Sequence, residues 1–231
     1  MSERFKNQAR LIDQSELAAR KIVVIGAGAI GSYVVQALAK MGAKDFVVYD
    51  DDTIEEHNVS NQLYPLKYVG VEKTTAITQL AKDFGGMEVE VAAKGRWTQE
   101  VAVDGDIIIC AVDNMDTRKL VWDHYKSRPI GFYVEGRMGA QVYRVYGINP
   151  LSGDDVSLYG NTLYTQSEAS PEPCGEKSII YCVLAVAATM ASQVKQFLMK
   201  EDRPTEVTYD AVNYQMQTKF TTRKEREVIE A

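Results

Sequence analysis

Residues 21–31 read Lys21-Ile-Val-Val-Ile25 and then, without a break, Gly26-Ala-Gly-Ala-Ile-Gly31. The β-branched run predicts a buried parallel strand, and the glycines fall where such a strand turns into a helix. Downstream, the apolar residues Val34, Val35, Leu38 and Met41 have helical spacing, which predicts a helix over 32–41 that stops at Gly42. A second β-branched run at 46–49 predicts another strand, so the segment is a βαβ unit.

The rest of the chain continues this alternation of strands and helices. Strands are expected at 87–92, 106–110 and 130–134, and helices at 73–84, 117–125 and 178–199. The strand expected at 141–148 alternates and is expected to be antiparallel, and 206–220 reads as one or two strands. Residues 151–177 lack periodicity and are expected to form a mobile crossover loop, and 221–231 is a charged tail. These features predict one α/β domain over 1–231, with a Rossmann-like, doubly wound, mostly parallel sheet.

Composition narrows the class of protein. The chain has 231 residues, of which 45% are apolar and 25% charged, which excludes a disordered or fibrous protein. The net charge of −6, without a basic block, argues against nucleic-acid binding. Three widely spaced cysteines predict reduced thiols rather than disulfides. Residues 1–14 do not resemble a signal peptide, and the apolar stretch 179–188 is too short to span a bilayer. A cytoplasmic protein without a membrane partner is expected.

The glycine pattern at 26, 28 and 31, between a strand and a helix, predicts phosphate binding. Its backbone can approach a phosphate closely, and the helix N-terminus offers unpaired N–H groups. Asp50 follows the second strand, where a carboxylate can accept a hydrogen bond from a ribose hydroxyl. The alternative is that the glycines serve only tight helix–strand packing. The fingerprint alone favours NAD.

Three later features favour ATP over NAD. The first is the run 50–58, an acidic stretch that ends in Asn58 and precedes Asn61-Gln62; the second is Gly70-x-x-Lys73 at a helix start. The third is Asp113-Asn114 directly after a buried strand. A lysine suits phosphate oxygens and an aspartate suits Mg²⁺, so the set fits a triphosphate with a divalent cation. The alternatives are an ordinary helical lysine and residues that cap the next helix.

With these motifs, the chain resembles the ThiF/MoeB/HesA family, the bacterial relatives of ubiquitin-activating enzymes, over about residues 19–198. The resemblance implies ATP- and Mg²⁺-dependent adenylation of the C-terminal glycine of a ubiquitin-like or sulfur-carrier protein, by a homodimer. It implies that Lys73 and Asp113 are catalytic, with Asp113 binding the metal. The implied nucleotide-binding set is Gly26, Ala27, Gly28, Ala29, Ile30, Gly31, Asp50, Asp52, Asn58, Gln62, Lys73, Asp113 and Asn114.

The chain departs from the family pattern at several positions. Asn61 stands where many members have an arginine, and Asn cannot replace its charge. Arg118 or Arg137 would then be expected to compensate. The N-terminal arginine that usually reaches the partner protomer has only Arg4 or Arg10 as a match. No Cys-x-x-Cys pair exists, so no structural zinc is expected.

Cys174 lies in Pro171-Glu-Pro-Cys-Gly-Glu176, within the expected loop and just before the long helix. Because some relatives use a cysteine in this region for a thioester or persulfide, it is a candidate catalytic thiol. The neighbouring glutamates oppose thiolate formation, so an unreactive loop cysteine is the alternative. Cys110 and Cys182 lie in apolar patterns and are expected in the core.

Three functions remain in competition. The adenylyltransferase accounts for the most motifs. A NAD(P)-dependent Rossmann oxidoreductase would need a hydride-transfer base, and the sequence offers no persuasive one. A non-catalytic relative that binds nucleotide or a peptide is kept open by Asn61.

Overall fold

The computed structural model describes residues 3–168 and 178–221, and its centre is a sheet of eight strands. In sheet order β3-β2-β1-β4-β5-β6-β7-β8, the first five are parallel and the last three are antiparallel to their neighbours. This arrangement confirms the predicted fold class. The strands are β1 (Lys21–Ile25), β2 (Asp45–Tyr49), β3 (Glu90–Lys94), β4 (Ile107–Cys110), β5 (Phe132–Gly139), β6 (Val142–Ile148), β7 (Glu206–Asp210) and β8 (Gln215–Lys219).

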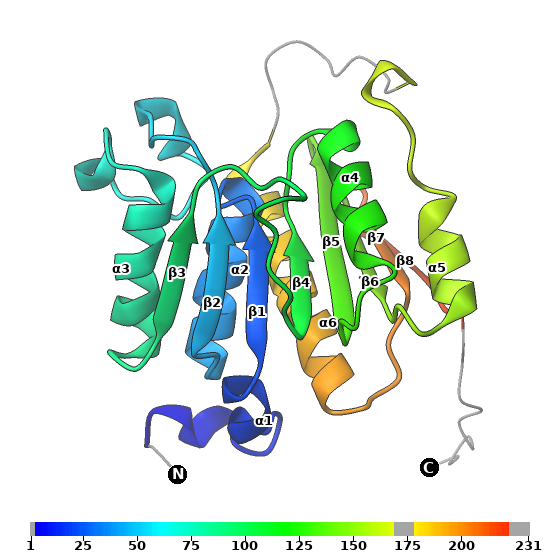
Figure 1. Ribbon diagram of the computed structural model, residues 1–231, viewed down its shortest axis with the longest axis horizontal. Helices are drawn as coiled ribbons and strands as arrows, with labels where there is room; N and C mark the ends of the chain where they lie inside the picture. The colour runs from blue at the N-terminus through cyan, green and yellow to red at the C-terminus, as the bar shows by residue number, and fades with distance from the viewer. Residues whose placement is uncertain (1–2, 169–177, 222–231) are drawn as a thin grey trace.

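Helices cover both faces of the sheet (Figure 1). The two that pack against α2 share its face, and α4 and α5 lie on the other, in front in the figure. The α-helices are α1 (Gln14–Ala18), α2 (Ala29–Met41), α3 (Lys73–Gly85), α4 (Met115–Tyr125), α5 (Gly153–Gly160) and α6 (Ile180–Leu198). Short 3₁₀ helices are η1 (Glu3–Gln8), η2 (Glu56–Asn58), η3 (Leu66–Tyr68) and η4 (Gln166–Glu168).

The side chains of the buried strands pack into two separate cores, one on each face of the sheet, because successive side chains of a strand point to opposite faces. In β1, Ile22 and Val24 join the core under α2, α3 and α6, whereas Val23 and Ile25 join the core under α4 and α5. Each strand in the middle of the sheet is therefore apolar on both faces, which is why it reads as a continuous apolar run.

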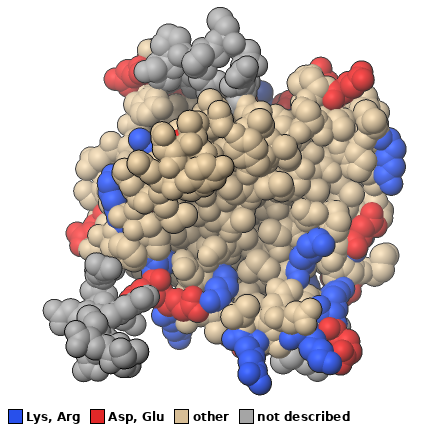
Figure 2. Space-filling model, turned by 180° about the vertical axis from the view of Figure 1, so that it is seen from behind, with Lys and Arg blue, Asp and Glu red and all other residues tan. Residues whose placement is uncertain are grey.

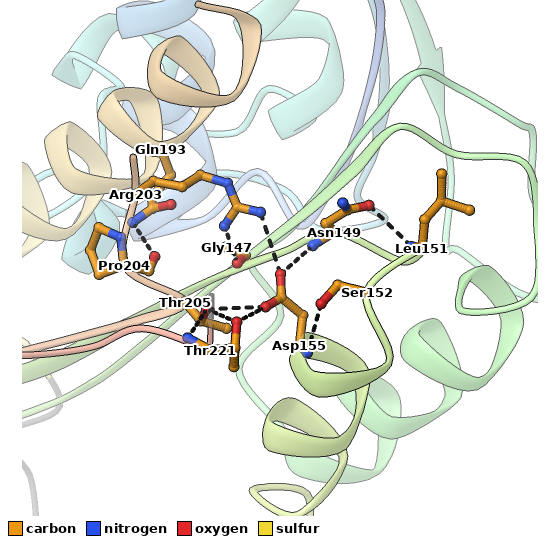
Figure 3. Close-up of polar contacts among 10 residues, drawn as sticks. All are labelled: Gly147, Asn149, Leu151, Ser152, Asp155, Gln193, Arg203, Pro204, Thr205 and Thr221. Atoms are coloured by element: carbon orange, nitrogen blue, oxygen red, sulfur yellow. Dashed lines mark hydrogen bonds and ion pairs between the residues drawn. The ribbon is translucent and has the colours of Figure 1, made fainter. Parts of the chain in front are cut away.

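The helix α5 corrects the expectation that 151–177 lacks regular structure. Ser152 caps it by accepting a hydrogen bond from the Asp155 amide at 3.2 Å. Asp155 is almost fully buried and accepts hydrogen bonds from the Asn149 amide at 2.9 Å and from the hydroxyls of Thr205 and Thr221 (Figure 3). One carboxylate thus ties α5 to segments more than 45 residues away, a tertiary contact that no local pattern announces.

One helix in the described part, α6, is long and apolar enough to cross a membrane by length and composition. At Ile180–Leu198 it extends ten residues beyond the apolar stretch 179–188, which alone is too short to span a bilayer. In this structure α6 packs on α2, β5 and β6, and 44% of its most apolar window is buried inside the molecule.

Candidate functional site

A cleft of about 1970 Å³ opens at the carboxyl ends of the parallel strands. It lies where the sheet order runs outward from β1 in two directions, to β2 and to β4. Such a switch point separates the loops of neighbouring strands and is where open α/β sheets bind ligands. Most of the residues proposed from sequence line this cleft: Gly26, Gly28, Ala29, Ile30, Asp50, Asp52, Asn58, Gln62, Lys73, Asp113 and Asn114.

The three glycines of the loop have different tasks. Gly26 has φ +93°, and a Cβ there would lie 2.6 Å from the Ala111 carbonyl oxygen. A Cβ on Gly31 would lie 1.8 Å from the Gly26 carbonyl oxygen, so this position serves packing. A Cβ on Gly28, in contrast, would meet nothing within 4 Å. Gly28 therefore leaves open space at the N-terminus of α2, whose first N–H groups have no side-chain cap.

Asp50 connects the glycine loop to the next loop. Its Oδ2 accepts from the Ala27 amide at 2.7 Å, and its Oδ1 accepts from the Asp52 amide at 2.9 Å. Burial raises the pKa of Asp50, and the Lys73 ammonium partly opposes that effect. Ala27 itself is buried, and neither Ala27 nor Gly31 lines the cleft; they shape it from behind.

Lys73 is the first residue of α3 and is 5% exposed. Its Nζ lies 2.6 Å from Asp52 Oδ2 and 3.8 Å from Asp50 Oδ1. Asp52 is largely exposed and is also the ion-pair partner of this lysine. The fold thus holds a buried ammonium at the cleft wall, and an incoming phosphate would compete with Asp52 for it.

The asparagines of the second loop bind the protein itself. Asn58 Oδ1 accepts from the Glu55 amide at 2.9 Å and so caps η2. Asn61 Nδ2 donates to Ser178 Oγ at 2.6 Å, joining this loop to the segment that precedes α6. Gln62 differs, because its Oε1 is buried without a hydrogen-bond partner among the described residues. That unsatisfied acceptor lies on the wall of the cleft.

Asp113 and Asn114 follow β4 and divide two tasks between them. Asn114 caps α4 by accepting from the Thr117 amide at 2.8 Å. Asp113 is exposed and lines the cleft, and its carboxylate forms no hydrogen bond or ion pair with any other described residue. The capping alternative therefore applies to Asn114 and leaves the Asp113 carboxylate available.

Sequence reasoning missed Glu135, which is fully buried between two arginines. Arg118 Nε lies 2.6 Å from Glu135 Oε1, and Arg137 Nε donates to Glu135 Oε2 at 2.8 Å. Arg137 also donates to the carbonyl and the hydroxyl of Thr162. Neither guanidinium is free to replace the charge missing at Asn61. The available signal was a lone glutamate directly after the run 130–134, which reads as a buried strand, because a buried charge needs partners.

The remaining candidates fall elsewhere. Cys174 lies outside the described residues. Cys110 and Cys182 are buried, as expected, and burial raises the pKa of both thiols. Arg4 lies in η1 and donates to Glu88 at 2.7 Å. Arg10 is exposed.

Comparisons with known proteins agree with this geometry. The chain is 32% identical over 115 residues to the SAMP-activating enzyme E1 of Haloferax volcanii. The aligned segment covers 48% of this chain and 43% of that relative. The chain is 30% identical over 115 residues to a maize protein named adenylyltransferase and sulfurtransferase MOCS3-1, covering 48% of this chain and 25% of that one. The chain thus matches less than half of the length of these curated relatives.

Among solved structures, E. coli MccB with AMPCPP and MccA superposes with a TM-score of 0.77 at 17% identity, over 97% of this chain and 73% of that one. At this identity the likeness shows the fold alone. The model of the ThiF family matches residues 4–228, nearly the whole sequence. On that match, the chain belongs to the ThiF family.

Proposed function

We propose that the protein is an ATP- and Mg²⁺-dependent adenylyltransferase that activates the C-terminal carboxylate of a small protein. The observation that carries this proposal is the convergence of Lys73 and Asp113 on the cleft that Gly28 leaves open. A dinucleotide fold needs only the glycine loop and Asp50. The added ammonium and carboxylate suit a triphosphate with its metal.

Each residue has a distinct role in this proposal. The α2 amides and Lys73 hold phosphate oxygens, and Asp50 accepts from the ribose. Within the described residues no group of three acidic, His or Cys side chains is arranged to hold a metal ion. Asp113 would therefore share Mg²⁺ with phosphate oxygens and water, the usual manner for this ion. The attacking carboxylate forms a bond to the α-phosphorus while the bond to the β-phosphate oxygen breaks, and pyrophosphate leaves.

The acceptor we propose is a ubiquitin-like or sulfur-carrier protein that ends in glycine. The relatives named above as activating enzyme and as adenylyltransferase and sulfurtransferase support this class. If the activated acceptor then passes to Cys174, the enzyme forms a thioester or persulfide. If it does not, the enzyme stops at the adenylate. We propose neither a nucleic acid nor a membrane as a partner. A cytoplasmic location is proposed, because reduced thiols are the rule in that compartment.

The proposed assembly is a homodimer, and an uncharged surface supports it. Viewed from behind, the face that carries α2 and α6 has a wide central area without charged side chains (Figure 2). Tyr181, Leu184 and Ala188 of α6 are exposed one helical turn apart. A continuous uncharged patch on a globular protein is typical of an interaction site.

The experiment is ATP–pyrophosphate exchange with small proteins that end in Gly-Gly, each compared with its C-terminally amidated form. Exchange is expected with the free carboxylate only, and calorimetry is expected to show binding of ATP with Mg²⁺ but not of NAD. Micromolar NAD binding without ATP binding would refute the proposal.

A second candidate, a nucleotide-binding relative without catalytic activity, is favoured by one observation. Asn61 is uncharged and donates to Ser178, and the N–H donors of Arg118 and Arg137 are directed to Glu135 and to other protein atoms rather than held free for phosphates. ATP binding without exchange for any acceptor would favour this candidate.

A further inference from the structure

Arg144 lies on the side of the cleft away from the glycine loop. It is on β6, opposite Arg137 of β5 and Thr208 of β7. Directly paired residues of antiparallel strands point to the same face of the sheet. Arg144 therefore shares the face of Arg137, and its exposed side chain lines the cleft.

The charge of Arg144 is not neutralised within the described residues. The other lysine and arginine side chains of the cleft have carboxylate partners: Lys73 with Asp52, Arg96 with Asp51, and Arg118 and Arg137 with Glu135. Arg144 forms no ion pair with any carboxylate of residues 3–168 and 178–221. Asp210, on the neighbouring strand, is instead hydrogen-bonded to Val212 and Asn213 of the β7–β8 turn.

The surroundings of Arg144 suit a peptide rather than a lone ion. Val142, two residues earlier on the same face, is 40% exposed, and Tyr164 on the same cleft is 42% exposed. A guanidinium beside apolar side chains matches a carboxylate side chain on an extended peptide, because the pair forms charge-assisted hydrogen bonds. Apolar neighbours would pack against the stem of that side chain.

Strand geometry sets how far Arg144 lies from the reacting end. From β1 to β6 the sheet order crosses β4 and β5, which is about 14 Å at the usual strand spacing. The pairing of β4 with β5 ends at Glu135. Arg144 lies opposite Arg137, which is two residues beyond Glu135 and therefore about 7 Å further along the strand. The separation is then about 16 Å, which an extended chain covers in about five residues.

We propose that Arg144 selects an acidic side chain in the C-terminal tail of the acceptor, about four to six residues from the terminal carboxylate. This inference rests on the proposed function, because it needs a tail whose end reaches the nucleotide. Arg144 acts on the choice of acceptor rather than on the adenylation step.

The test uses fluorescein-labelled decapeptides that end in Gly-Gly, with a single Glu or a single Lys moved through positions three to eight from the C-terminus. Anisotropy with AMPCPP and Mg²⁺ gives binding, and ATP–pyrophosphate exchange gives activity. Wild type is expected to prefer Glu over Lys about tenfold at positions four to six, since a hydrogen-bonded charge pair contributes that much. Arg144→Gln should remove the preference and Arg144→Glu should reverse it.

Arg96→Gln is the matched control, because Arg96 also lines the cleft but already pairs with Asp51. Its peptide preference should equal that of wild type. A wild-type preference that is flat across the peptides would overturn the inference. So would weaker ATP binding by Arg144→Gln without peptide, which would assign Arg144 to the phosphates. Selective binding of Glu peptides without any exchange would support the inference while refuting the proposed adenylation.

Discussion

Gly28 and Gly31 are three residues apart, yet the structure predicts opposite consequences for the same substitution. A Cβ on Gly28 meets nothing within 4 Å, and the residue, with φ −76° and ψ −144°, is not in the left-handed region. Gly28→Ala should change the free energy of unfolding by less than about 1 kcal/mol. The new methyl occupies the open space beside the α2 amides, so the Kd for ATP measured by calorimetry should rise about tenfold or more, a cost of about 1.4 kcal/mol.

Gly31→Ala supplies the matched comparison, because its methyl would lie 1.8 Å from a backbone oxygen. Overpacking of this kind costs typically about 1–3 kcal/mol and can cost more, so this variant should lose stability in thermal unfolding. Equal ATP affinity of Gly28→Ala and wild type would place the phosphates elsewhere.

Asp113 is expected to matter for chemistry and not for folding, because its side chain is exposed and Asn114 does the capping. Asp113→Asn should reduce ATP–pyrophosphate exchange about 100-fold or more while the melting temperature stays within about 2 °C of wild type. Asp123→Asn, in the same helix region but paired with Lys119 and Lys126, is the control and should keep its exchange. Exchange by Asp113→Asn that matches wild type at saturating Mg²⁺ would remove the metal assignment.

Among the elements, α5 rests on a buried charge. Asp155 is 3% exposed and bonds the Asn149 amide, Thr205 and Thr221, with the Arg203 guanidinium at 3.4 Å. Asp155→Ala leaves the largely buried Arg203 without this partner, so we expect a loss of about 3–5 kcal/mol in urea unfolding. Asp154→Ala, at the exposed neighbouring position, should change stability by less than about 0.5 kcal/mol. A small effect at both positions would mean that the network contributes little.

The helix α5 also shows which parts of the fold could be predicted from the sequence and which could not. β1, α2 and the residues directly after β2 and β4 were predictable because their signals are local: β-branched runs, glycines and helix spacing. α5 was taken for loop, because its short Gly- and Asp-rich sequence is stabilised by Thr205 and Thr221, far along the chain. The ion pair of Glu135 with Arg118 was missed for the same reason, since it depends on how α4 packs beside β5. Arg137, in contrast, lies only two residues from Glu135 on the same strand.

At the scale of the whole molecule, the cleft depends on both halves of the sheet. The parallel half supplies the glycine loop, Asp50 and Asp113, and the antiparallel half supplies the wall that carries Arg144. Opposite the helices α4 and α5, the uncharged surface of α6 remains exposed (Figure 2). If this surface joins two copies, each cleft is formed within one protomer while the assembly is held through the other face of the sheet.

Leu184→Glu tests that assembly, because it places a charge in the middle of the exposed α6 residues, between Tyr181 and Ala188. A standard interface buries about 800 Å² per partner and is depleted of charge at its core, so the variant should dissociate. Sedimentation at micromolar concentration should give a dimer for wild type and a monomer for Leu184→Glu, and both should give the same far-ultraviolet circular dichroism spectrum, because the monomer stays folded. Leu151→Glu, at a leucine that is 90% exposed just before α5, is the control and should remain dimeric. A monomeric wild type, or a dimeric Leu184→Glu, would rule out this face as the contact.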